Sequence, residues 1–242
     1  MDKNVFHRIE KKYIISSQQK KQLIRFIRAK MKKDDYHKSG VYNIYFDNDN
    51  FDTIINSIDW VDFKAKIRAR NYQGYDRVFL EIKTKIHSAE ENYGYKRRVR
   101  ISLKDYEALV SGGSTLSEIV IQERPSVRDL QIAKEIDYLI ARFGLSPKLL
   151  VMYDRESYRD NEGLRVTFDE NLRYREKNLC YIPQKDDKIY FKDKNNIIME
   201  VKAHGVIPLW LTKAMTSTKV YPERFSKIGN VYQKIIKEGQ NV

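Results

Sequence analysis

The strongest constraint on the fold is an alternation of basic and apolar residues that recurs along several strand-like segments. Residues 63–72, FKAKIRARNY, carry lysine or arginine at every second position, namely Lys64, Lys66, Arg68 and Arg70. Because successive side chains of a β-strand point to opposite faces, these four cations share one face and small apolar residues occupy the other. The segment therefore predicts a strand with one apolar and one positively charged face.

Other strand-like segments repeat this alternation. Their charged or polar positions are Arg8, Glu10 and Lys12 in 5–14, Glu81, Lys83 and Lys85 in 77–85, Lys96, Arg98 and Arg100 in 93–103, Arg165, Thr167 and Asp169 in 163–175, and Glu200 and Lys202 in 196–203. Segment 148–158 is the least regular, because Arg155 has the same parity as Val151 and Tyr153. A face that is merely solvated usually mixes both signs, because like charges opposite each other are destabilising. The excess of cations therefore favours an anion as the usual occupant of this face.

The remaining pattern predicts an α+β protein built on a large antiparallel sheet. A further strand is predicted over residues 41–47, and turn-like stretches between consecutive strands are typical of hairpins. Helices are predicted over 16–34, 126–144 and 222–239, the first opening with a capping-box pattern at Ser16. A small apolar helix at 208–215 is a further candidate, either closing one end of the structure or contacting a partner.

Closing the sheet would turn the charged faces inward. Eight strands would then form a barrel, or tunnel, with a basic lumen and an apolar exterior covered by helices. The sequence has neither an internal repeat nor a linker-like segment, so we expect a single domain over residues 1–242. Inside such a tunnel, guanidinium groups could hold phosphate oxygens bidentately.

Charge and composition indicate what kind of partner the protein binds and in which compartment it acts. The formal net charge is +13, which favours a polyanionic partner. Cys180 is the only cysteine, and no apolar run approaches the roughly 20 residues that span a bilayer. We therefore expect an intracellular, cytoplasmic protein. The many tyrosines fit ordinary strand packing better than base stacking, so nucleic acid is not the expected partner.

Carboxylates on the charged faces suggest a divalent metal. Glu10, Glu81 and Glu200 could hold Mg²⁺ or Mn²⁺, which take oxygen ligands and bridge to substrate phosphates. The alternative for each glutamate is a salt bridge to a neighbouring arginine. The pattern does not choose between the two.

Eight motifs taken together resemble a known family. RIEKKY, KIRARNY, LEIKTK, KRRVRI, DRESY, LRVTFD, MEVKA and RFSKIGN occur in the order and spacing of the VTC domain, over about residues 5–236. This is the polyphosphate polymerase domain of the vacuolar transporter chaperone complex, within the triphosphate tunnel metalloenzyme (CYTH-like) superfamily. The resemblance implies an eight-stranded tunnel that transfers the γ-phosphoryl group of ATP to a growing polyphosphate chain, with Mn²⁺ or Mg²⁺ as cofactor.

The resemblance also implies site residues. The catalytic cations would be Arg68, Arg70, Lys83, Arg98, Arg155 and Arg165, and the substrate-binding residues Lys12, Lys202, Ser226 and Lys227, with Arg8, Lys96 and Arg100 added from the strand pattern. Glu200 is the preferred metal ligand. Ser226 and Lys227 would lie at the start of the C-terminal helix, where free N–H groups and the helix dipole favour anions.

One residue differs from the pattern of the superfamily in a way that bears on the type of reaction. Hydrolases of the superfamily begin with an E-x-E-x-K motif, whereas Arg8 takes the first acidic position here. One carboxylate fewer and one cation more favour holding phosphate over activating water. Two alternatives stay open, namely a tripolyphosphatase or nucleoside triphosphatase, and a non-catalytic polyanion-binding module. The eukaryotic complex acts beside membrane-spanning subunits, which leaves a membrane partner possible.

Overall fold

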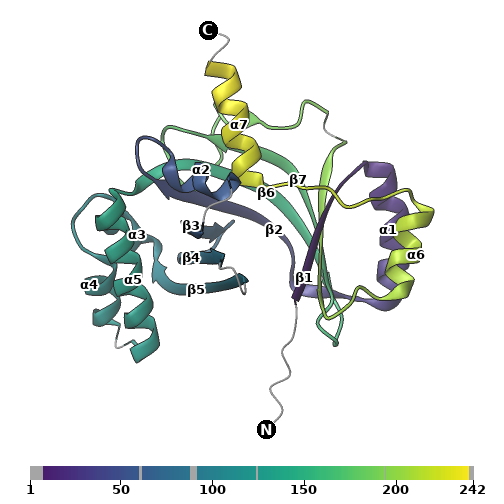
Figure 1. Ribbon diagram of the computed structural model, residues 1–242, viewed down its shortest axis with the longest axis horizontal. Helices are drawn as coiled ribbons and strands as arrows, with labels where there is room; N and C mark the ends of the chain where they lie inside the picture. Colours follow the sequence, from purple (N-terminus) through teal and green to yellow (C-terminus); the bar gives the residue numbers. More distant parts are fainter. Residues whose placement is uncertain (1–7, 60–61, 88–91, 124, 194, 240–242) are drawn as a thin grey trace. The chain divides into compact units, whose positions relative to one another are not determined.

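A computed structural model describes residues 8–59, 62–87, 92–123, 125–193 and 195–239 (Figure 1). The strands are β1 (Arg8–Ile15), β2 (Lys32–Asp47), β3 (Phe63–Tyr72), β4 (Arg77–His87), β5 (Asn92–Ser102), β6 (Ser146–Arg159), β7 (Arg165–Arg175), β8 (Lys188–Ile189) and β9 (Ile197–His204). The helices are α1 (Ser17–Lys30), α2 (Asp52–Ile58), α3 (Leu103–Val110), α4 (Leu116–Gln122), α5 (Val127–Phe143), α6 (Leu209–Ser217) and α7 (Lys227–Gly239). No helix in the described ranges has both the length and the apolar character needed to cross a membrane.

The strands form one large sheet in the order β1-β9-β7-β6-β2-β3-β4-β5, and β8 pairs with β7. The α+β class and the large antiparallel sheet are therefore confirmed. The sheet has nine strands rather than the eight that were predicted. The additional strand is β8, which has two residues. Among the described residues, backbone pairing does not close the sheet, because the order ends at β1 and β5. Alternation fixes which residues share a face, but it carries no information about whether the two end strands pair.

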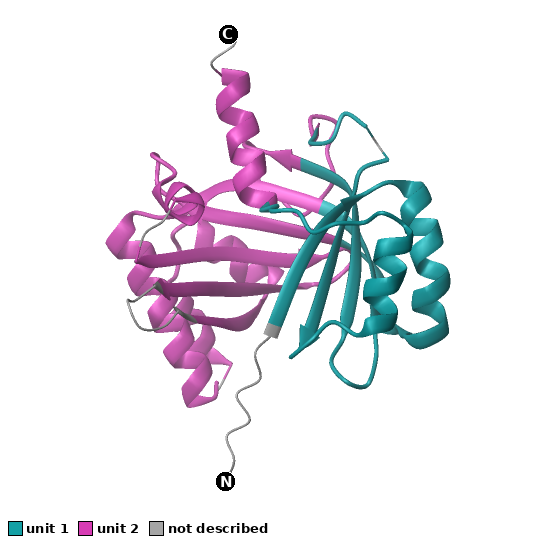
Figure 2. Cartoon of the chain, turned by 45° about the vertical axis from the view of Figure 1, so that its right-hand side comes forward, with its two compact units in different colours: residues 1–40, 153–173, 189–226 teal, residues 41–152, 174–188, 227–242 magenta. Residues whose placement is uncertain are grey.

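The chain divides into two compact units, each assembled from separate stretches of sequence (Figure 2). Unit 1 contains residues 1–40, 153–173 and 189–226, and unit 2 contains residues 41–152, 174–188 and 227–242. Strands β2, β6, β7 and β8 contribute residues to both units. The single domain over residues 1–242 stays a prediction.

In unit 1, α1 and α6 cover the apolar face of the sheet (Figure 1). Leu23 and Ile27 of α1 and Leu211 of α6 pack with Phe168 of β7 and Met199 of β9. The capping box at Ser16 is present as predicted, and the small apolar helix expected over 208–215 is α6. Burial of these side chains is the main favourable term that holds the two helices on the sheet.

Two predicted helix boundaries are wrong. Helix α1 ends at Lys30 rather than at residue 34, because Met31 is extended and Lys32 begins β2. Side chains of β6 bond to this part of β2, as in the hydrogen bond from Ser157 Oγ to Tyr36 O. The C-terminal helix begins at Lys227 rather than at residue 222, because the backbone N–H of Glu223 donates to the carbonyl of Lys12. Contacts distant in sequence decided both boundaries.

In unit 2, helices cover the apolar face of β2 to β5. Ile67 of β3, Leu80 of β4 and Val99 of β5 are buried against residues of α3, α4 and α5, including Ile119 and Ile136. The short helices α2, α3 and α4 were not predicted. Their local signals were present, since Thr115 caps α4 in a capping box and the Asp47 carboxylate accepts two N–H groups at the start of α2. Seven or eight residues give too few turns for a helical period to be recognised.

Candidate functional site

In unit 2, the basic residues that alternate with apolar ones along β3, β4 and β5 lie on one face of the sheet. We define the basic face as Lys64, Lys66, Arg68 and Arg70 of β3, Glu81, Lys83 and Lys85 of β4, and Lys96, Arg98 and Arg100 of β5, which the strand registers place side by side. Lys66 lies opposite Lys83, and Lys83 in turn lies opposite Lys96. Like charges directly opposite one another destabilise a sheet, so this face favours a bound anion.

Glu81 is the acidic member of the basic face and is almost fully buried, with 2% of its surface exposed. Arg68 Nε and Nη2 each lie 2.6 Å from Glu81 Oε2, and Lys96 Nζ lies 2.6 Å from Oε1. Arg70 Nε is 3.9 Å from Oε2. These contacts match the salt-bridge alternative for Glu81. Its role as a metal ligand stays a prediction.

The electrostatics of this cluster follow from its charges. Burial would raise the pKa of Glu81, but Arg68, Arg70 and Lys96 outweigh burial and lower that pKa from 4.5 to about 2. Burial lowers the pKa of Lys96 to about 8, opposed by Glu81 and assisted by repulsion from Arg68 and Arg70. Glu81 therefore acts as a permanently charged counter-ion that holds the two arginines in place.

Three residues that sequence reasoning did not assign support the basic face. Asn43 Oδ1 accepts a hydrogen bond from Arg70 Nε at 2.8 Å, and Asn43 Nδ2 donates to Val151 O. Tyr45 lies opposite Arg68 in the strand register, and Phe79 lies 4.9 Å from the Arg98 guanidinium, measured to its ring centroid. A role for Asn43 could have been inferred from the sequence, because it is a polar residue within the otherwise apolar segment VYNIYF.

Unit 1 has its own charged face, which we call the Glu200 cluster: Glu10 and Lys12 of β1, Arg155 of β6, Arg165, Thr167 and Asp169 of β7, and Glu200 and Lys202 of β9. Glu10 lies opposite Lys202, and Lys12 lies opposite Glu200. Lys202 Nζ is 3.2 Å from Glu200 Oε1 and 3.5 Å from Glu10 Oε2. The shared face predicted for these strands is confirmed.

Alternation along the strand did not show which face Arg155 lies on, but the structure places it in the Glu200 cluster. Its Nε and Nη2 donate to the two oxygens of Asp169 at 2.6 and 2.8 Å, and Nη2 is 3.7 Å from Glu200 Oε2. Burial would lower the pKa of Arg155, but Asp169, Tyr153 and Glu200 raise it well above its ordinary value. Carboxylates offset most of the cationic charge in the Glu200 cluster, whereas cations dominate the basic face.

Two polar atoms in the Glu200 cluster are buried without a hydrogen-bond partner in the described part of the chain, Arg165 Nε and Thr167 Oγ1. Arg165 Nη2 lies 2.8 Å from Asp34 Oδ2, so its other end is fixed. Thr167 lies opposite Glu200 in the register of β7 and β9. Because buried polar atoms are nearly always hydrogen-bonded, these two are positions where a bound water or ligand atom would complete the contacts. Sequence analysis placed Thr167 on this face but gave it no role, and did not identify Asp34.

The other predicted residues are placed as follows. Lys12 Nζ donates to Phe225 O at 3.1 Å, which ties β1 to the segment before α7. Ser226 and Lys227 lie at the start of α7, as expected. Lys83, Arg98 and Arg100 are exposed on the basic face, and the side chain of Arg8 lies outside the described part of the structure. The proposed role of each residue in substrate binding stays a prediction.

A divalent metal would need oxygen ligands from carboxylate side chains that lie close together. Within the described residues there is no group of three or more His, Cys, Asp or Glu side chains arranged to hold a metal ion. Glu10 and Glu200 share Lys202 as a partner on neighbouring strands. Mg²⁺ is commonly bound by one or two carboxylates together with substrate phosphates and water. This pair therefore fits a metal that is held partly by its substrate.

Comparison with known proteins agrees with the recognised motifs. Vacuolar transporter chaperone complex subunit 4 of Schizosaccharomyces pombe is 25% identical over 146 residues, which are 55% of this chain and 20% of that protein. The subunit 4 of Trypanosoma brucei brucei is 24% identical over 155 residues, which are 56% of this chain and 20% of that protein. The chain thus spans about a fifth of the length of these curated relatives.

The fold has a counterpart among solved structures. The putative adenylyl cyclase HpAC1 from Hippeastrum, described as having a dominant triphosphatase activity, superposes with a TM-score of 0.52 at 13% identity. The superposition covers 91% of this chain and 93% of that one, and at this identity it supports the fold alone. The family model for the VTC domain matches residues 7–236. This match covers nearly the whole chain, which therefore belongs to the VTC domain family, as its motifs predicted.

Proposed function

We propose that this chain is a polyphosphate polymerase, which transfers the γ-phosphoryl group of ATP to a growing chain of inorganic polyphosphate in a metal-dependent reaction. The observation that carries the proposal is the basic face, where lysines lie opposite lysines across β3, β4 and β5. A chain of phosphates offers regularly spaced negative charge to such a surface. Membership of the VTC domain family supports the same substrate class.

The side chains of the basic face suit phosphoryl transfer. Arg68 and Arg70 are held by Glu81 and Asn43, so their guanidinium groups are fixed before a phosphate arrives. Guanidinium groups bind phosphate oxygens bidentately, and Lys83 and Arg98 add further positive charge at the exposed surface. Positioning and charge neutralisation are the main demands of this reaction.

In the proposed step, an oxygen of the terminal phosphate of the chain attacks the γ-phosphorus of ATP. The bond between that phosphorus and the β–γ bridging oxygen breaks, and ADP leaves with the electron pair. A phosphate nucleophile is already ionised, so no protein base has to remove a proton. The cations of the basic face bring two polyanions together and neutralise the charge on the transferred group.

Glu200 and Glu10 are the residues that would hold the divalent metal in unit 1. A bound Mg²⁺ or Mn²⁺ supplies additional positive charge to phosphate oxygens. Lys202 contacts both carboxylates, and its positive charge offsets the repulsion between them. Arg155 is fixed by Asp169 and contributes a permanent charge beside Glu200.

The nearest alternative is hydrolysis of triphosphate by the same residues. A protein of similar fold from Hippeastrum is described as having a dominant triphosphatase activity, so the fold is compatible with this alternative, whereas the Arg8 departure favours the polymerase. A module that binds polyphosphate without turnover is the other alternative. We also propose that the chain acts in the cytoplasm, as its sequence led us to expect. Its relatives are named as subunits of a vacuolar complex, which supports the proposal that it acts with other subunits or beside a membrane partner.

The test is incubation of the purified protein with ATP and Mn²⁺ or Mg²⁺, with and without a short polyphosphate primer. Gel electrophoresis and ³¹P NMR would resolve the products. Long chains together with ADP support the polymerase. Orthophosphate without chains would assign a hydrolase instead, and binding of polyphosphate with neither product would leave a non-catalytic module.

A further inference from the structure

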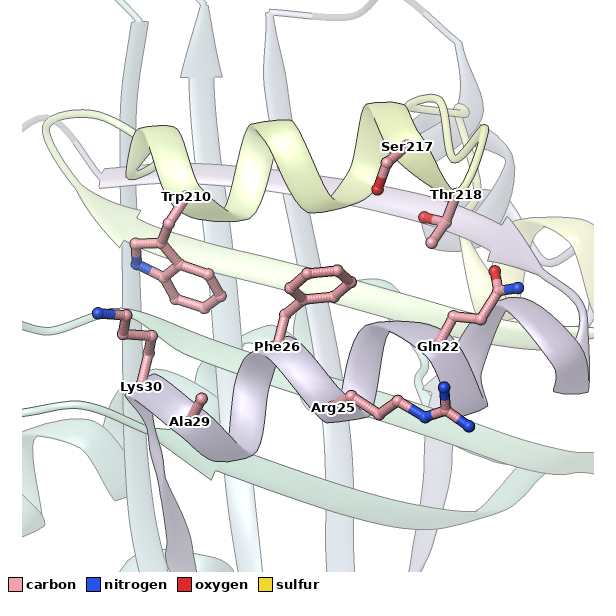
Figure 3. A pocket seen from close by; sticks show the side chains of 8 residues that line it. All are labelled: Gln22, Arg25, Phe26, Ala29, Lys30, Trp210, Ser217 and Thr218. Carbon is pink, nitrogen blue, oxygen red and sulfur yellow. The ribbon is translucent and has the colours of Figure 1, made fainter.

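Unit 1 has a groove between α1 and α6 (Figure 3). The groove encloses about 600 Å³. Its walls include Gln22, Phe26 and Ala29 of α1 and Trp210 of α6. The helices pack on the face of β9 that carries Met199, and Glu200 points to the opposite face. The groove is therefore separate from the residues proposed for phosphate transfer.

The centre of the groove is aromatic and accessible. Figure 3 shows Phe26 and Trp210 extending from the two helices into the space between them. Phe26 is 47% exposed, whereas Trp210 is partly buried because it also packs against the apolar core beneath the two helices. Contiguous exposed apolar side chains with a polar rim are typical of interaction sites. Aromatic residues of this kind are the usual anchors of such sites.

The charged residues of the two helices that form the groove all have the same sign. Helix α1 (SQQKKQLIRFIRAK) contains five basic residues and α6 (LWLTKAMTS) contains one, and neither helix contains an acidic residue. Lys20 points inward to Glu156 and Glu170, while Arg25 and Lys30 line the groove and Lys213 is exposed on α6. A partner with carboxylates beside an apolar stripe would be complementary to this surface.

We propose that the α1–α6 groove docks an acidic amphipathic helix of a protein partner. A third helix fits a groove between two helices, with its apolar stripe against Phe26 and Trp210. Glutamates or aspartates flanking that stripe would pair with Arg25 and Lys30. The concave shape favours a helix over a flat bilayer surface, which would contact protruding side chains and leave the groove empty.

The experiment uses the full chain with Trp60 replaced by Phe, so that Trp210 becomes the single tryptophan reporter. The probe is a model peptide of ~18 residues, five helical turns, with leucine at i, i+3, i+4 and i+7 and glutamate elsewhere. A second peptide carries lysine in place of every glutamate. Titrations of Trp210 fluorescence are made with saturating tripolyphosphate present, so that the basic face is occupied.

The expected result is a saturable blue shift of Trp210 emission with the acidic peptide and none with the basic one. Phe26→Ala, and Arg25→Glu combined with Lys30→Glu, should each weaken binding by about tenfold or more. Tyr138→Ala, and Arg128→Glu combined with Lys134→Glu, are matched controls on the exposed surface of α5 and should change binding by less than about twofold.

Three results would overturn the proposal. The first is no saturable change with the acidic peptide in a variant whose circular dichroism matches that of the wild type. The second is an equal loss of binding in the α5 controls, which would indicate non-specific charge attraction. The third is a shift of Trp210 with phosphatidylcholine vesicles containing about one third phosphatidylserine but not with the peptide, which would assign the surface to a membrane.

Discussion

Replacing Glu81 with glutamine tests the basic face most closely. The substitution keeps the shape of the side chain and removes the buried charge that Arg68 and Lys96 contact at 2.6 Å. The two guanidinium groups and the ammonium group would then repel one another without a counter-ion. We therefore expect Glu81→Gln to destabilise the folded protein, and an added phosphate anion to restore part of the loss.

The magnitude follows from the pKa of Glu81. A fall from 4.5 to about 2 corresponds to about 3 kcal/mol of stability, since each pKa unit is worth about 1.4 kcal/mol. Because the folded-state pKa is depressed, this stability is fully present above about pH 4.5 and is lost as the pH falls towards 2. In Glu81→Gln, this contribution to the pH dependence should be absent.

Urea denaturation between pH 3 and 7, with and without tripolyphosphate, measures both effects. Glu135→Gln is the matched control, because Glu135 pairs with Arg97 on the other face of β5, where the pair is partly exposed and worth about 0–1 kcal/mol. Tripolyphosphate should stabilise Glu81→Gln more than the wild type. Equal stability of Glu81→Gln and wild type at pH 7, or equal stabilisation of both by tripolyphosphate, would refute the reasoning.

Three further predictions concern turnover and the core. Arg68→Ala and Arg165→Ala should each reduce turnover of ATP to background while circular dichroism stays unchanged, and wild-type rates in either variant would remove that residue from the site. Glu200→Gln should weaken activation by Mn²⁺, seen as a metal concentration for half-maximal rate raised by about tenfold or more, while tripolyphosphate binding without metal is retained. An unchanged metal dependence would exclude Glu200 as a ligand. Leu23→Ala should lower the free energy of unfolding by about 2–5 kcal/mol, because Leu23 is a fully buried residue of α1, and a loss below about 1 kcal/mol in urea denaturation would contradict the packing of α1 on the sheet.

Alternation along strands predicted much of the site, because a period of two residues is a direct consequence of strand geometry. It placed Arg68 and Glu81 on one face, and the registers of β3 and β4 put them opposite each other. It was silent on Arg155, whose neighbours of the same parity are Val151 and Tyr153. Only the fold shows that this arginine meets Asp169 from the adjacent strand.

Features that depend on distant contacts could not be read from local patterns. The segment after α1, KKDDYH, has no apolar period, so its strand conformation depends on partners such as Ser157 of β6. The hydroxyl of Thr167 is buried with no hydrogen-bond partner among the described residues, and the sequence could not predict this because it depends on how the neighbouring strands pack. Closure of the sheet is a third case, since pairing of the end strands leaves no trace in the side-chain period.

The most direct test of the proposed polymerase is the ratio of ADP released to phosphate residues incorporated into chains. The proposed step predicts one ADP for each phosphate added, little free orthophosphate, and loss of both products in Arg68→Ala. ADP formed with an equal amount of orthophosphate and no chain growth would contradict the polymerase, and would show that water is the acceptor.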